Sequence, residues 1–330
     1  PSTLVPLEVD RIYMYDLLDA PDPWQWSFFK AGQTKDTPFS LAGVDSSRPA
    51  TIRVHLQGGS DSGVAGEHHL SLSLNATPLG EVSFEGELPH LFETSVGPGI
   101  LLDGSNTLTV TNHGDAGVGS LAFLDRIDIV HPRTPDLVAG RFDATWGASG
   151  AAEVSGDASW ALDVTDPATP AWLTSLGPGA SSVQMGVQAA HRYLLVSPEG
   201  LRAPRVSWPL EARPRATQNQ ADYILVGPQA FMEAAQPLLQ RRQDQGLVTF
   251  AASLEQITSS FGGGQTSAQA IRDFLAFAFH SWQDPAPRYV LLLGDAYTDP
   301  RALGGYSAPS PLPALWARTS YMWTAADPLI

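Results

Sequence analysis

Two aspartates follow one apolar run of the sequence, at a position where an α/β protein would bind a ligand. Asp295 and Asp299 lie in the segment 294–301, directly after the apolar residues 289–293. Because open parallel sheets bind ligands at the carboxyl ends of their strands, these two carboxylates are candidates for binding or catalysis. In the alternative interpretation, which we favour, each carboxylate accepts hydrogen bonds from nearby loop amides and stiffens the turn.

Residue type and spacing disfavour the other motifs that could carry chemistry. The glycine-rich segment 262–267 lacks the lysine of a phosphate-binding loop and does not follow the first strand, so we interpret it as a flexible loop that caps a helix. His68 and His69 would point to opposite faces of a strand and cannot chelate one ion together. The sequence has no cysteine, no zincin motif and no Gly-x-Ser-x-Gly motif. We therefore expect no cofactor, no metal site and no cysteine-based catalysis within these residues.

Two tryptophans near the start are candidates for contact with a sugar. Trp24 and Trp26 alternate with Phe28 in a stretch that we expect to be extended. Aromatic rings on a jelly roll can stack on sugars, but tryptophan packs more often in a core or between sheets. We favour the packing interpretation and keep glycan binding as the alternative.

The elements that would position Asp295 and Asp299 are predicted by the pattern of the last third of the chain. Short apolar runs typical of buried parallel strands alternate with stretches of helical periodicity. Strands are expected at 223–226, 247–251 and 289–293, and helices at 231–239 and 271–282. Pro237 is expected to kink the first helix, and Gly246 to cap it. Strand–helix–strand–helix–strand predicts a right-handed parallel crossover unit, which we assign to a partial α/β domain at residues 219–330.

The first part of the chain follows a different pattern. Apolar and polar residues alternate in short segments separated by turn residues, which predicts an all-β sandwich of the jelly-roll type over residues 1–134. The clearest of these segments are 51–56, 70–74, 107–111 and 127–130. Residues 135–218 contain further strands, at 160–164 and 191–196, among many prolines. We interpret this stretch as a small β-rich connector module that ends in a polar linker at 211–220.

Composition excludes several classes of partner. The formal net charge is −15 and the isoelectric point is near 4.8, which argues against nucleic-acid binding and against attraction to anionic membranes. The sequence has no apolar run of about 18 residues, so we expect no membrane-spanning helix. It opens at Pro1 without a basic-then-apolar segment, and its last residues are not a polar tail. We expect it to be the front portion of a longer protein.

Several blocks between residues 221 and 301 carry a resemblance to a known family. These blocks are Ala221-Asp222-Tyr223-Ile224, the helix at 236–238 with Arg241-Arg242 and Gly246 after it, the segment 270–275 and the segment 287–295. In this order they resemble the start of the gingipain-type cysteine peptidase domain. Residues 162–167 are also similar to the region that precedes this domain in bacterial proteins.

The resemblance implies a caspase-like α/β fold, cysteine endopeptidase activity on peptide or protein substrates, and export to the bacterial surface or medium. In this family the catalytic His and Cys follow the strand that ends in Gly-Asp, so the resemblance places the dyad downstream of this chain. Asp327 is the nearest positional match to an Asp that lines the pocket for a basic substrate side chain. In the alternative interpretation Asp327 is an exposed residue near the end of the sequence.

The leading hypothesis is therefore the N-terminal fragment of an exported gingipain-like cysteine endopeptidase, inactive by itself. The alternative is a non-enzymatic surface or binding protein with a degenerate peptidase-like domain. In either case the sandwich could bind carbohydrate, since it is similar to jelly-roll domains of the carbohydrate-binding or adhesin type.

Overall fold

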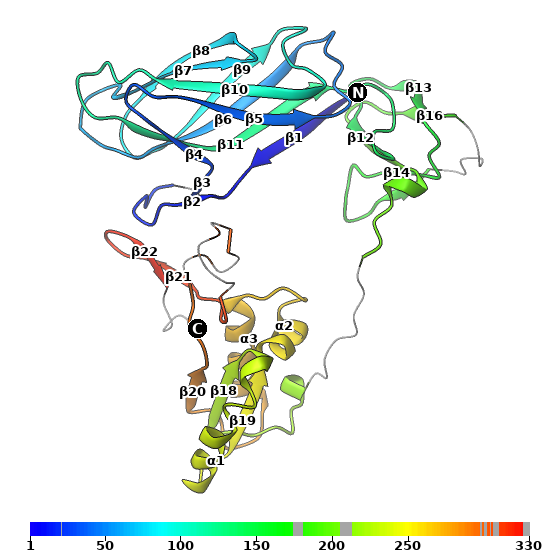
Figure 1. The fold of residues 1–330 in the computed structure, drawn as a ribbon. Coiled ribbons are helices and arrows are strands. Elements are labelled where there is room, and N and C mark those ends of the chain that lie inside the picture. The colour runs from blue at the N-terminus through cyan, green and yellow to red at the C-terminus, as the bar shows by residue number, and fades with distance from the viewer. Residues whose placement is uncertain are drawn as a thin grey trace. The chain divides into compact units, whose positions relative to one another are not determined.

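The computed structural model describes residues 1–20, 22–173, 181–204, 213–297, 299, 302–303, 305 and 310–325 (Figure 1). These residues form two units with separate cores. One consists of Pro1–Ile12 with Asp19–Pro204, and the other of Tyr13–Leu18 with Arg205–Ile330. We call them the N-terminal unit and the C-terminal unit and describe each by itself.

Two antiparallel sheets form most of the N-terminal unit. The larger contains β1 (Ser2–Glu8), β4 (Ser27–Lys30), β6 (Ala50–Gly58), β9 (Pro89–Val96), β11 (Leu121–Pro132), β12 (Arg141–Thr145), β14 (Trp160–Asp163), β15 (Ala171–Trp172) and β17 (Arg192–Val196). Its order is β15-β14-β17-β12-β1-β11-β6-β9, with β4 paired to β11. The smaller contains β5 (Thr34–Leu41), β7 (His68–Leu74), β8 (Thr77–Phe84) and β10 (Gly104–Asn112), in the order β5-β10-β7-β8.

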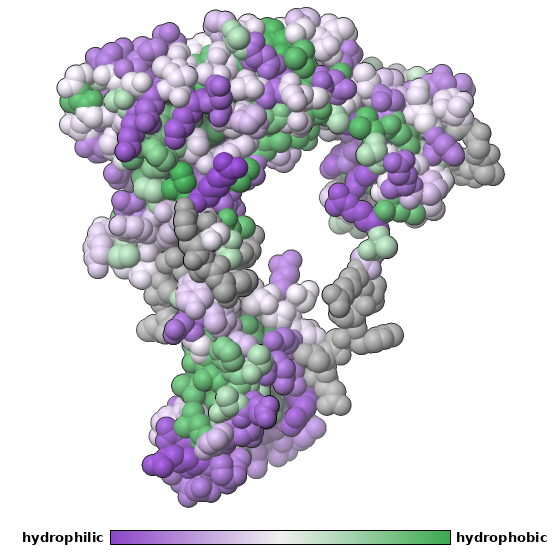
Figure 2. Space-filling model, viewed as in Figure 1, coloured by the Kyte–Doolittle hydropathy of each residue, from purple (hydrophilic) through white to green (hydrophobic). Residues whose placement is uncertain are grey.

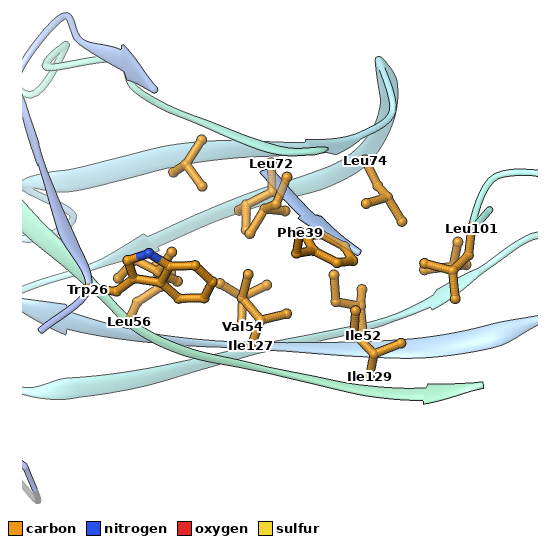
Figure 3. Packing of buried hydrophobic residues seen from close by; sticks show 14 of the residues in the cluster. Trp26, Phe39, Ile52, Val54, Leu56, Leu72, Leu74, Leu101, Ile127 and Ile129 are labelled. Carbon is orange, nitrogen blue, oxygen red and sulfur yellow. The ribbon is translucent and has the colours of Figure 1, made fainter. Parts of the chain in front are cut away.

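Alternation of side chains explains why these sheets pack face to face. In β7 every second residue, from His68 to Leu74, is buried, as expected for a strand with one face toward a core. Both sheets contribute to one apolar cluster, in which Leu72 of the smaller sheet and Ile127 of the larger lie between the layers together with Trp26 (Figure 3). The predicted β-sandwich is therefore present.

The sheet continues through the predicted boundary at residues 134 and 135. β1 pairs with β11 on one side and meets β12 on the other, at Ser2 and Thr145. β12, β14 and β17 also enclose a second core around Phe142, Tyr193 and Leu195 with the two-stranded antiparallel sheet of β13 (Gly150–Ser155) and β16 (Ser182–Val187). The boundaries at 134/135 and 218/219 remain predictions.

A three-stranded parallel sheet is the centre of the C-terminal unit. Its order is β19 (Thr249–Ser253), β18 (Tyr223–Gly227), β20 (Tyr289–Leu292), and both pairings are parallel. The helices are α1 (Gln236–Asp244), α2 (Leu254–Phe261) and α3 (Ala268–Ser281). Ile224 and Val226 of β18 pack with α2 and α3, whereas Tyr223 and Leu225 pack with α1. β18 is therefore buried on both faces, as the continuous apolar run predicts.

The structure differs from the sequence-based expectation at three places in this unit. Pro237 does not kink a helix, because α1 begins at Gln236 and places the proline in its first turn, where no amide hydrogen is needed. Helix α2 was not predicted. In the predicted linker, Pro214 is buried, and its carbonyl accepts a hydrogen bond from Trp282 Nε1 at 3.1 Å. The guanidinium carbon of Arg215 lies 4.3 Å from the centroid of the Phe261 ring.

The remaining described elements are short. They are the hairpins β2 (Ile12–Tyr13) with β3 (Trp24–Gln25) and β21 (Trp316–Arg318) with β22 (Trp323–Ala325), and the 3-10 turns η1 (Pro198–Gly200), η2 (Arg213–Arg215) and η3 (Gln229–Phe231). None of the helices in the described part of the chain combines the length and apolarity that a membrane crossing requires.

Candidate functional site

The carboxyl ends of the three parallel strands form one edge of the sheet in the C-terminal unit. β18 ends at Gly227, which is in register with Ser253 at the end of β19. The Ser253 hydroxyl accepts a hydrogen bond from Gln256 N at 3.2 Å, and the Gln256 side chain accepts one from Ser253 N at 3.1 Å. This capping box starts α2 directly at the end of the strand.

Two glycines, Gly227 and Gly294, allow the chain segments that leave β18 and β20 to approach each other closely at this edge. Leu293 N donates to Val226 O at 2.7 Å, so the ladder continues one residue beyond β20. A Cβ atom on Gly227 would lie 2.9 Å from both the Cβ and the carbonyl oxygen of Leu293, closer than side chains approach. Gly294 has φ +127°, a conformation that favours glycine, and the chain turns there into the segment with the two aspartates.

Asp295 and Asp299 have different environments. Asp299 is 8% exposed, and its carboxylate accepts a hydrogen bond from Leu303 N at 2.8 Å, in agreement with the turn-stiffening interpretation. Asp295 is exposed, and its backbone carbonyl accepts a hydrogen bond from Leu312 N at 3.3 Å. Among the described residues, none donates a hydrogen bond to the Asp295 carboxylate. A substrate-binding role for Asp295 remains a prediction, and Asp327 lies outside the described residues.

At the opposite, amino edge of the sheet a buried carboxylate joins all three strands. Asp222 precedes β18 and is 7% exposed. Its Oδ2 accepts a hydrogen bond from Val248 N, just before β19, at 3.1 Å, and its Oδ1 lies 3.0 Å from an Arg288 guanidinium nitrogen, just before β20. Its backbone carbonyl also accepts hydrogen bonds from Arg288 N and Tyr289 N, both at 2.9 Å. Asp222 therefore aligns the strands from the edge that is remote from the candidate site.

A group of four carboxylates lies beside β11 in the N-terminal unit. Oxygens of Glu8, Asp10 and Asp22 lie within 4.8 Å of one another. Asp125 occupies an irregularity in the register of β11 with β6, and its Oδ1 is buried without a hydrogen-bond partner among the described residues. Burial raises the pKa of Asp125 to about 7, and the nearby Glu8 and Asp22 carboxylates add to this effect.

This pKa predicts a pH-dependent stability of the N-terminal unit. Because the pKa of Asp125 is higher in the folded chain than its ordinary value of 3.8, the folded state retains a proton that the unfolded state has released. The contribution of Asp125 to stability is therefore full at low pH and is lost as the pH rises to about 7.

Allowing for solvent screening, we expect Asp125→Asn to stabilise the unit by about 1–2 kcal/mol more at pH 8 than at pH 4. Urea unfolding of wild type and variant followed by circular dichroism at both pH values measures this difference. A stability difference that does not change with pH would contradict the prediction.

The two candidate sugar-stacking tryptophans lie in different surroundings. Trp26 is 8% exposed and belongs to the sandwich core, so its ring offers no face to a sugar (Figure 3). Trp24 is half-buried in β3, and its backbone N donates to Asp22 Oδ1 at 2.8 Å. Glycan stacking on Trp24 remains a prediction.

Residues 216–327 match the family described as peptidase family C25, over a segment that includes β18, β19 and β20. This segment is of the gingipain type. The gingipain-type segment thus contains the capping box at Ser253, the turn at Gly294 and both edges of the parallel sheet.

A solved structure has the fold of the whole chain. PorU from Porphyromonas gingivalis, crystallised in a dimeric latent form, is similar with a TM-score of 0.73 and 18% sequence identity. The alignment covers 99% of this chain and 34% of the PorU chain, so the chain spans about a third of the length of PorU. At this identity the likeness shows the fold alone. It includes both the mostly β N-terminal unit and the gingipain-type segment.

Other similarities cover a smaller share of the chain. One is to the CBM36-1 domain of a multidomain xylanase from the hindgut metagenome of Trinervitermes trinervoides, at 13% identity over 39% of this chain and 96% of that one. Another is to a CBM36 carbohydrate-binding module in complex with calcium and xylotriose, at 16% identity over 38% and 98%. Both TM-scores are 0.26, which supports no argument about fold or ligand. No curated protein matches the chain.

The residues that carry the family resemblance are mainly structural. Asp222 and Arg288 join the strands at the amino edge of the gingipain-type segment, and Gly246, at φ +85°, ends the turn after α1 with its N donating to Gln243 O at 2.8 Å. Sequence reasoning identified these positions as family blocks but did not identify their roles, because their partners come from separate parts of the sequence.

Proposed function

We propose that this chain is the N-terminal portion of an exported gingipain-like cysteine endopeptidase of bacteria, and that β19, β18 and β20 are the first half of a caspase-like catalytic sheet. The observation that carries the proposal is the C25 match over a parallel sheet in which, among the described residues, no further strand pairs with the outer edge of β20. The jelly-roll assignment of the sandwich and the secreted or cell-surface location belong to the same proposal.

The exposure of β20 supports the continuation of the sheet. Parallel strands are normally covered on both faces, as β18 is. In β20, however, Tyr289 is 52% exposed and Val290 is 45% exposed, and Phe279 of α3 is 57% exposed. Hydrophobic residues accordingly reach the surface over β20 (Figure 2). Further strands paired with β20, and helices packed on them, would cover these side chains.

The chemistry divides between this chain and the rest of the protein. A cysteine endopeptidase needs a thiolate that attacks the substrate carbonyl, a His that takes the thiol proton and later protonates the leaving amine, and amides that stabilise the oxyanion. Because these 330 residues contain no cysteine, we place the dyad outside this sequence. The role proposed for this chain is to align the parallel strands and to contribute carboxylates, Asp295 and Asp327, to substrate binding.

The test is the activity of the longer protein that contains these residues. We expect it to hydrolyse Arg or Lys fluorogenic peptides in a thiol-dependent reaction that is abolished by replacing the dyad Cys with alanine. The 330-residue chain by itself is expected to show no turnover. If Asp327 binds a basic side chain, Asp327→Asn raises KM for Arg and Lys peptides and leaves hydrolysis of neutral peptides unchanged.

The alternative function predicts the opposite results. A surface or binding protein with a degenerate peptidase-like domain would lack a His followed by a Cys in the residues after β20. It would hydrolyse none of the peptides at any thiol concentration. Either result would exclude the peptidase proposal and would leave the fold of the gingipain-type segment unaffected.

A further inference from the structure

Two histidines and a glutamate meet on the exposed face of the smaller sheet in the N-terminal unit. His69 lies on β7, Glu81 lies on β8, and His113 directly follows the last residue of β10. These three strands are neighbours in the order β10-β7-β8. One ligand atom from each of the three side chains lies within 4.8 Å of the other two.

The backbone holds these residues in place. His113 N donates to His69 O at 2.9 Å, so the residue after β10 remains tied to β7. Across the other side of β7, His69 pairs with Ser83 and Ser71 pairs with Glu81, which puts Glu81 diagonally opposite His69. His68 is fully buried, so alternation directs His69 to the outer face. The three side chains therefore come from a hydrogen-bonded sheet rather than from a flexible loop.

A further carboxylate orients His69. Asp115 Oδ2 lies 2.8 Å from His69 Nδ1, while Glu81 Oε2 lies 3.3 Å from His69 Nε2. When Nδ1–H donates to Asp115, the lone pair of Nε2 faces the side where Glu81 lies. A metal-bound histidine commonly donates its other ring N–H to a carboxylate in this way, which fixes its tautomer and orientation.

The second imidazole completes the donor set. The ring centroids of His69 and His113 are 4.6 Å apart, with an interplanar angle of 36°. Two imidazoles with one carboxylate are typical ligands of zinc, whereas calcium and magnesium prefer oxygen atoms alone. Three protein ligands leave a tetrahedral ion one position for water.

We propose that His69, His113 and Glu81 bind a zinc ion on the outer face of the smaller sheet, with Asp115 as the positioning residue for His69. The ion would join β10, β7 and β8 and is independent of the peptidase proposal. The proposal departs from the expectation of no metal site, because that expectation considered only the pair His68 and His69, and the sequence alone does not bring Glu81 and His113 to the same place.

The competing explanation is that His69 is protonated and that no metal ion binds to these side chains. The hydrogen bond with Asp115 raises the pKa of His69, burial opposes this effect, and Glu81 adds to it. A protonated His69 would pair with both carboxylates without needing His113. The two explanations therefore differ in whether His113 matters.

The experiment is a titration of the untagged, chelator-treated 330-residue chain with Zn²⁺ by calorimetry, repeated with Co²⁺ to observe its visible absorption. We expect one ion per chain. His69→Ala and His113→Ala are expected to abolish binding, and Asp115→Asn to weaken it about 10-fold or more. His191→Ala is the matched control, because His191 Nδ1 lies 2.7 Å from Asp163 Oδ2 and belongs to no such group of three among the described residues.

Each outcome bears on the proposal. Circular dichroism establishes that the variants are folded, which the partly or fully exposed positions of all four side chains favour. Excess Zn²⁺ should raise the melting temperature of wild type and His191→Ala but not that of His113→Ala. The absence of Zn²⁺ binding to wild type, or binding that His69→Ala and His113→Ala leave unchanged, would overturn the proposal.

Discussion

Replacing Phe274 with alanine is expected to lower the free energy of unfolding of the C-terminal unit by about 3–5 kcal/mol. Phe274 is fully buried in α3, and its ring lies 5.7 Å from that of Phe261 and 5.8 Å from that of Trp282 between centroids. Truncation would remove the contacts of the ring with Phe261 of α2 and with Trp282, the residue that follows α3. It would also leave a cavity against the sheet. Hydrogen exchange of peptides from β18, followed by mass spectrometry, measures the change within this unit alone.

The same helix supplies the control. Phe279 is 57% exposed, and we expect Phe279→Ala to change the stability of the isolated chain by no more than about 0.5 kcal/mol. Equal effects of the two substitutions would mean that Phe279 is covered in solution. That outcome would contradict an open face beside β20.

Asp222→Ala is expected to destabilise the C-terminal unit by about 2–4 kcal/mol. The substitution removes the acceptor of the Val248 amide at a buried position, together with the partner of Arg288. A buried donor left without a partner is more destabilising than the mean value of a hydrogen bond suggests. Hydrogen exchange of the peptides that contain β19 and β20 reports the effect on each neighbouring strand.

Two further variants separate the contributions of the amide and the charge. Asp222→Asn retains an oxygen for Val248 N and should be destabilising by a smaller amount. Arg288→Ala should have an effect of at most about 1 kcal/mol, because the Arg288 side chain is 62% exposed and such ion pairs contribute little. If Arg288→Ala were as destabilising as Asp222→Ala, the ion pair rather than the amide hydrogen bond would be the main contributor.

Elements with a continuous or strictly periodic pattern could be predicted from the sequence. The apolar run at 223–226 is β18, and the helical period at 271–282 corresponds to α3, whose N-cap Ser267 accepts a hydrogen bond from Ala270 N at 3.2 Å. The alternating segments at 70–74 and 107–111 lie within β7 and β10. In each case burial follows from the local period alone.

Elements whose formation depends on distant partners could not be predicted. Helix α2 is only eight residues long, and its apolar residues Leu254, Ile257 and Phe261 repeat too few times to show a period. The polar segment at 211–220 resembles a linker until Phe261 and Trp282 are placed beside Arg215 and Pro214.

The same limit applies to the candidate sites. The two aspartates after β20 could be located at the carboxyl edge of the sheet, because strand direction follows from the crossover pattern. Which of them is bonded within its own turn depends on Leu303, which no period predicts. The association of His69 with Glu81 and His113 depends on the order of three antiparallel strands, and alternation gives the face of a residue but not its neighbours.

The position of β1 has a consequence for the synthesis of this protein. β1 lies between β11 and β12 in the larger sheet, with Leu4 opposite Val130 and Ser2 opposite Thr145. β1 precedes both flanking strands in the sequence and therefore has no partner in this sheet until the chain has been made through β11 and β12. The pairing of β1 with β11 and β12 joins residues that are far apart in the sequence, and closing such a long loop costs conformational entropy. All-β proteins dominated by contacts of this kind fold in milliseconds to seconds. The larger sheet can thus be completed only after β11 and β12 have been synthesised.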